Sequence, residues 1–192
     1  MNRREAIKNL SISLGVTIAM PTVLSIFNAC DRKTGSWHSE FFNNDEKIIV
    51  ENLINTILSV DKNSFGGQLN LVQFVDKIIA HTLTPTQKQL FRKGAIAFGE
   101  KFEDLHGKNI VKGDHQEYDK ILALYLKLSK IEEKKVLEQL QISFANVPEE
   151  KKTTYLIYKF LINVRKLALI GYFTSKEIIE NKLEYQFDNR YV

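Results

Sequence analysis

The sequence predicts an all-α fold, a compact bundle of about five to seven helices that follows an N-terminal signal segment. Apolar residues recur at the i, i+3, i+4 spacing of a helix along most of residues 41–192. Helix-start signatures separate these stretches, and no segment alternates apolar and polar residues as a half-buried strand does. Because each apolar stripe must be covered, we expect the helices to bury their stripes against one another.

The first two predicted helices are recognised by their apolar stripes. One stripe lies within residues 48–58, with Asn43 or Asn44 as the helix cap, and the second lies within residues 71–79. The glycine-containing polar segment at 61–67 separates the two helices as a turn.

Three later helices begin at capping patterns, in which a short polar side chain is followed three residues later by Glu or Gln. The pairs are Thr84 with Gln87, Asp114 with Glu117, and Ser129 with Glu132. Pro85 strengthens the first start, because proline is favoured at the first position of a helix.

The fifth and sixth predicted helices complete the domain. The fifth, which begins at Ser129, carries its apolar stripe at Val136, Leu137 and Leu140. The sixth and longest runs from about residue 148 to residue 170. Gly171 is predicted to end it, because glycine commonly closes helices in the left-handed conformation.

Size and charge narrow the class of protein. The chain has 192 residues, of which 44% are hydrophobic and 26% charged, as in one globular domain. The net charge is +4, but the first 29 residues hold three of the 27 basic and one of the 23 acidic side chains, which leaves 24 against 22. A charge so balanced does not predict nucleic-acid binding.

The N-terminal segment has the layout of an export signal, with a basic start followed by an uncharged apolar stretch. Its start, Met-Asn-Arg-Arg-Glu-Ala-Ile-Lys, contains the pair Arg3 and Arg4 and resembles the motif of the twin-arginine pathway, which exports folded proteins. A general secretory signal also begins with basic residues and is the alternative.

Cys30 is the only cysteine, so it has no internal disulfide partner. It follows Phe-Asn-Ala, and the four residues resemble a lipoprotein box, in which the signal is cut before a cysteine that carries diacylglycerol. We therefore expect an exported protein, lipid-anchored on the periplasmic face of a bacterial membrane. A cleaved soluble protein and an uncleaved N-terminal anchor are the alternatives. The predicted boundaries are the signal at 1–29, the lipidated cysteine and tether at 30–40, and the helical domain at 41–192.

We predict no catalytic, cofactor-binding or metal site on this chain. No two of the four histidines stand three or four residues apart, as metal ligands on one helix face would. One cysteine cannot form a haem-attachment motif, and the sequence contains no phosphate-binding loop or nucleophile elbow.

Aromatic residues late in the chain are the candidate partner interface. Tyr172 and Phe173 are followed by Tyr185 and Tyr191 in a polar tail. Core packing is one interpretation of these side chains. Contact with another protein is the other, because tyrosine is enriched in interface cores and so polar a tail cannot bury itself alone.

Four stretches together resemble the small third subunit of membrane-bound gluconate 2-dehydrogenase. They are the twin-arginine start, Phe-Phe-Asn-Asn-Asp-Glu-Lys at 41–47, the following helix into Leu-Ser-Val-Asp at 58–61, and Gly-Tyr-Phe-Thr-Ser-Lys-Glu at 171–177 with Tyr185 and Arg190-Tyr191 behind it. The Gly-Tyr-Phe-Thr-Ser run is the most distinctive of these.

The resemblance implies a non-catalytic accessory subunit that pairs with a large flavoprotein of the glucose-methanol-choline type, often alongside a cytochrome c. The partners would carry the FAD and any haem, and would oxidise a sugar or polyol. This chain would aid their export and anchoring. The alternative is a stand-alone helical lipoprotein that binds a ligand or an envelope partner through its own surface.

Overall fold

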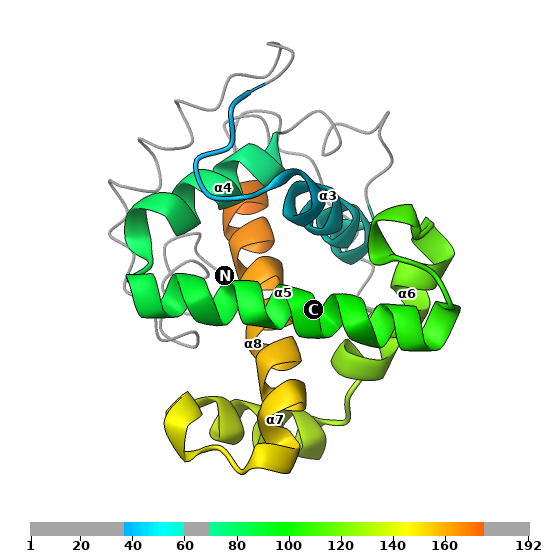
Figure 1. The fold of residues 1–192 in the computed structure, drawn as a ribbon, viewed down its shortest axis with the longest axis vertical. Helices are drawn as coiled ribbons and strands as arrows, with labels where there is room; N and C mark the ends of the chain where they lie inside the picture. Colours follow the sequence, from blue (N-terminus) through cyan, green and yellow to red (C-terminus); the bar gives the residue numbers. More distant parts are fainter. Residues whose placement is uncertain (1–36, 60–69, 175–192) are drawn as a thin grey trace. The chain divides into compact units, whose positions relative to one another are not determined.

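The computed structural model describes residues 37–59 and 70–174, and these ranges form an all-α protein without strands (Figure 1). This confirms the predicted fold class. The α-helices are α3 (Asn44–Leu58), α4 (Leu71–Thr82), α5 (Pro85–His106), α6 (His115–Leu126), α7 (Lys130–Leu140) and α8 (Glu149–Thr174). Two short 3-10 helices, η2 (Ile110–Lys112) and η3 (Phe144–Asn146), precede α6 and α8. The turn predicted at 61–67 lies outside the described residues.

Four of the helix starts are fixed by side-chain caps that the sequence predicts. Thr84, Asp114 and Ser129 each form a reciprocal capping box with the Glu or Gln three residues later. Asn43 forms the same arrangement with Glu46, so Asn43 rather than Asn44 is the cap of α3. Such caps satisfy N–H groups that the first turn of a helix leaves without partners, and each contributes about 1 kcal/mol.

The described chain divides into two compact units. The first comprises residues 37–59, 70–83 and 164–174, and the second comprises residues 84–163. Fully buried side chains form the core of each unit. They include Leu53, Leu58, Phe74, Ile78 and Ile79 in the first unit, and Phe91, Phe98, Phe102, Tyr118, Ile121 and Phe160 in the second.

Within the second unit, α5 and the first part of α8 approach each other closely at Gly94. A Cβ atom added to Gly94 would lie 2.6 Å from the carbonyl oxygen of Leu156 and 2.7 Å from the Cβ of Phe160. One turn away, the rings of Phe91 and Phe160 meet edge to face with their centroids 5.0 Å apart. The missing side chain of Gly94 thus allows the aromatic core to close around Phe160.

Helix α8 continues through Gly171 to Thr174, so the prediction that Gly171 ends the helix was wrong. In the first unit Gly171 lies against α4, where an added Cβ would stand 2.6 Å from the ring of Phe74 and 3.1 Å from the side chain of Leu71. The glycine therefore permits a close approach of two helices and does not adopt the left-handed conformation of a helix end.

Helix α7 has no buried residue. The sequence predicted a buried stripe at Val136, Leu137 and Leu140, but Val136 and Leu140 are half-buried and Leu137 is exposed. Local interactions stabilise the helix instead, namely the capping box at Ser129 and the exposed ion pair from Lys134 to its i+4 neighbour. The prediction that this stripe is buried against other helices of the chain was therefore wrong.

Candidate functional site

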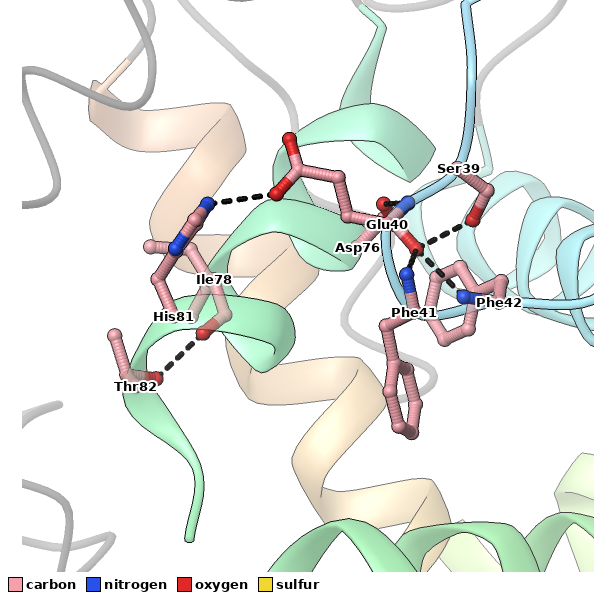
Figure 2. Close-up of polar contacts among 8 residues, drawn as sticks. All are labelled: Ser39, Glu40, Phe41, Phe42, Asp76, Ile78, His81 and Thr82. Carbon is pink, nitrogen blue, oxygen red and sulfur yellow. Dashed lines mark hydrogen bonds and ion pairs between the residues drawn. The ribbon is translucent and has the colours of Figure 1, made fainter. Parts of the chain in front are cut away.

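The most extensive polar site in the described ranges holds residues 37–42, which we call the strap, on helix α4. The strap leads into α3 and is bound by the carboxylate of Asp76, a residue of α4 that has 0% exposure. Oδ1 of Asp76 accepts hydrogen bonds from Ser39 Oγ at 2.6 Å, from Phe41 N at 3.0 Å and from Phe42 N at 2.7 Å. Oδ2 accepts a fourth from Glu40 N at 2.8 Å, and Figure 2 shows the four donors converging on the one carboxylate.

Burial of this carboxylate depends on these donors. A charged group that leaves water is strongly destabilised unless hydrogen bonds compensate it. Bonds to an ionised acceptor are stronger than bonds between neutral groups. The same bonds satisfy three backbone N–H groups of the strap, which precede the first turn of α3. Asp76 therefore fixes the course of the strap across α4.

Weaker contacts also hold the strap. Phe42 is buried beside the Asp76 carboxylate, whereas Glu40 Oε2 lies 2.7 Å from Nε2 of His81 on α4, and both of these side chains are exposed (Figure 2). Exposed pairs of this kind contribute little to stability. The ammonium of Lys47 lies 4.5 Å from the ring centroid of Trp37, which adds a cation–π contact between the strap and α3. The buried carboxylate is thus the main attachment of the strap.

Asp76 is absent from the site residues predicted from the sequence. A signal was available, because Asp76 stands four residues after Val72 and three before Ile79, on the apolar face of its helix. An acidic residue at such a position must find partners. Its partners lie 34 to 37 residues earlier in the chain, and helix periodicity cannot reveal them.

Most of the predicted site residues lie outside the described ranges; these are Arg3, Arg4, Cys30, Tyr185 and Tyr191. The structure does describe Tyr172 and Phe173. Tyr172 is 2% exposed, Phe173 is half-buried, and their rings meet edge to face with centroids 5.6 Å apart. Tyr172 therefore has the burial of a core residue, and a partner interface at these four aromatic positions stays a prediction.

A second polar cluster joins α6 to the loop before it. Lys108 Nζ lies 2.8 Å from Glu117 Oε2, and His106 Nδ1 lies 4.0 Å from the other oxygen of Glu117. The hydrogen bond from Lys108 lowers the pKa of the Glu117 carboxyl, and the same bond raises the pKa of Lys108. Both groups are therefore charged at neutral pH, and they fasten the loop between α5 and α6.

Neither cluster resembles a metal centre. Across residues 37–59 and 70–174, no group of three or more His, Cys, Asp and Glu side chains is placed to hold a metal ion. None of the helices in these two ranges is long and apolar enough to cross a membrane.

Fold and site together define a helical domain in which the buried carboxylate of Asp76 binds the segment that precedes α3. A comparison with family models matches residues 44–189 to gluconate 2-dehydrogenase subunit 3. The chain belongs to this family, as the resemblance in the sequence indicated. Searches of curated proteins and of solved structures each found no match.

Proposed function

We propose that this chain is the accessory subunit of an exported flavoprotein oxidoreductase that acts on a sugar or polyol, and that it helps to export and anchor that enzyme. The family match over residues 44–189 is the observation that carries the proposal. The match covers the helical domain from α3 onward, and the family is named for one subunit of a larger dehydrogenase.

The proposal assigns the oxidation to the partners. A large subunit of the glucose-methanol-choline type carries FAD and the substrate site, and a cytochrome c, where the complex includes one, carries haem. This chain supplies the binding surface, the twin-arginine signal at Arg3 and Arg4, and the lipid at Cys30.

The strap supports the anchoring part of the proposal. Residues 31–36 separate Cys30 from the strap and reach at most roughly 20 Å when extended. A lipid on Cys30 would therefore keep the strap near the membrane surface. The four hydrogen bonds between the strap and Asp76 would transmit a force on the lipid anchor to helix α4.

Purification from the native host tests the proposal. The full chain, carrying a C-terminal affinity tag and extracted with mild detergent, should bring with it a yellow protein with the absorbance of bound FAD. Mass spectrometry should identify that protein as a glucose-methanol-choline-type subunit. If the chain purifies alone, or with proteins that contain no flavin, the proposed function is wrong.

A further inference from the structure

The strap, residues 37–42, has little buried surface. Phe42 is its only buried residue, and the others are half-buried or exposed. Few buried contacts characterise the segments that open locally while the rest of a protein stays folded. The strap therefore has the burial of a segment that can detach while α3 and α4 keep their structure.

The hydrogen bonds of the strap to α4 share one acceptor. The backbone N–H groups of residues 40–42 and the hydroxyl of Ser39 all donate to the carboxylate of Asp76. None of the three N–H groups belongs to a helix, since α3 begins at Asn44. Loss of the contact with Asp76 breaks all four bonds together. We therefore expect the strap to detach as one cooperative unit.

Detachment of the strap does not leave a buried charge without partners. Asp76 is 0% exposed, and all four of its donors come from the strap (Figure 2). A carboxylate that lost these donors and stayed buried would be strongly destabilised. Because the donors are part of the segment that leaves, water can replace them around the carboxylate. The detached state thus avoids the largest penalty that breaking these bonds could carry.

Attachment of the strap also determines how far the helical domain can lie from Cys30. With the strap attached, residues 31–36 span at most roughly 20 Å between Cys30 and the strap. With the strap detached, the connection extends to Asn43, the cap of α3, and residues 31–42 span at most roughly 40 Å. Detachment therefore about doubles the greatest reach from Cys30 to the domain.

From these observations we infer that the strap is a releasable latch, which detaches from Asp76 while the helices stay folded and gives the anchored domain two tether lengths. The inference rests on the proposed function, because the tether needs a lipid at Cys30, and it deepens the anchoring part of that function. The attached strap keeps the domain close to the membrane. The detached strap lets the domain lie up to roughly 20 Å further away.

Hydrogen exchange of the full chain in detergent, measured by mass spectrometry at single-residue resolution, tests the release. Amides 40–42 should exchange more slowly than in an unfolded peptide, because Asp76 binds them, but about tenfold or more faster than the buried amides of α4. Low urea concentrations should accelerate exchange in α4 and leave the strap unchanged, because a local opening exposes little surface. The latch is wrong if the strap exchanges with the rate and urea dependence of α4, or without protection.

Asp76→Asn tests whether the carboxylate is the point of release. Asparagine keeps the size of the side chain but has no charge, and its nitrogen cannot accept a hydrogen bond. Exchange at amides 40–42 should become about tenfold faster or more. The matched control is Asp104→Asn, an exposed position on α5, which should leave exchange in the strap unchanged. Equal strap exchange in the two variants would show that Asp76 is not the latch.

The two tether lengths are tested on a supported bilayer that carries the lipid-bearing full chain. Neutron reflectometry measures the mean height of the domain above the bilayer, which Asp76→Asn should raise by at most roughly 20 Å and Asp104→Asn should leave unchanged. Equal heights in both variants would contradict the two tether lengths. If the wild-type chain does not attach to the bilayer, the proposed anchoring is wrong and the tether lengths fail with it, whereas the exchange experiment decides the release of the strap by itself.

Discussion

Asp76 shows that one side chain can satisfy backbone N–H groups that would otherwise pair within a helix or a sheet. Its two oxygens accept from three consecutive backbone N–H groups and one hydroxyl, although the strap belongs to no helix or sheet. The position of Asp76 on an apolar face was visible in the sequence. The identity of its donors was not, because a pairing across 34 to 37 residues depends on how α3 and the strap fold back on α4.

Replacing Asp76 by Ala should release the strap. The change removes the acceptor of all four bonds, and we expect a loss of stability on the order of 3 kcal/mol, since bonds to a buried charge contribute more than neutral ones. Urea unfolding followed by circular dichroism measures the loss. Chymotrypsin should also cut faster beside Phe42, which is buried in the wild type.

Asp104→Ala is the control for this change, because Asp104 is an exposed residue of α5 with the same side chain and charge. Its effect should stay within about 0.5 kcal/mol, as for most surface substitutions. Equal stability and equal cleavage rates in the two variants would show that the strap is held by other contacts.

At the scale of whole elements, the sequence predicted what is local and missed what is tertiary. Asn43, Thr84, Asp114 and Ser129 all cap helices, because a cap and its partner stand three residues apart. The role of Gly171 was predicted wrongly, because glycine also occurs where two helices pack closely. The ring that Gly171 contacts, that of Phe74, lies on another helix. The exposure of α7 could not be predicted either, because an apolar stripe in the sequence does not show whether another helix packs against it.

Two glycine substitutions separate these roles. Gly171→Ala should destabilise the protein by about 1–3 kcal/mol, because the new methyl group overlaps the ring of Phe74 and must displace it. Gly99→Ala, inside α5, should stabilise by about 0.5–1 kcal/mol, because alanine is the better helix former and the nearest atom, on Ile110, lies at 3.4 Å. Thermal denaturation of both variants measures the difference. A stabilising Gly171→Ala would mean that the two helices do not meet closely there.

For the whole molecule, the sequence predicted the family and the helical fold, and both are confirmed. It predicted no chemistry on the chain, and it offered Tyr172 as an interface residue, whereas Tyr172 is 2% exposed within the described residues. An interface is difficult to read from one chain, because half of its complementary surface belongs to the partner. In the proposed function, export depends on Arg3 and Arg4, and anchoring depends on Cys30. The cell compartment that contains the flavin enzyme tests both.

Two variants of the full chain should place that enzyme in different compartments. With Arg3→Lys and Arg4→Lys, the proposed twin-arginine motif is lost while the charge stays, so the proposal expects both this chain and the flavin subunit to remain in the cytoplasm. With Cys30→Ala, the proposal expects both proteins to be exported but to move from the membrane to the soluble fraction, because the proposed lipid cannot be attached. Fractionation, with dehydrogenase activity and bound FAD as readouts, distinguishes the two results. Export of the flavin subunit despite the two lysines would show that it has a signal of its own and does not depend on this chain to cross the membrane.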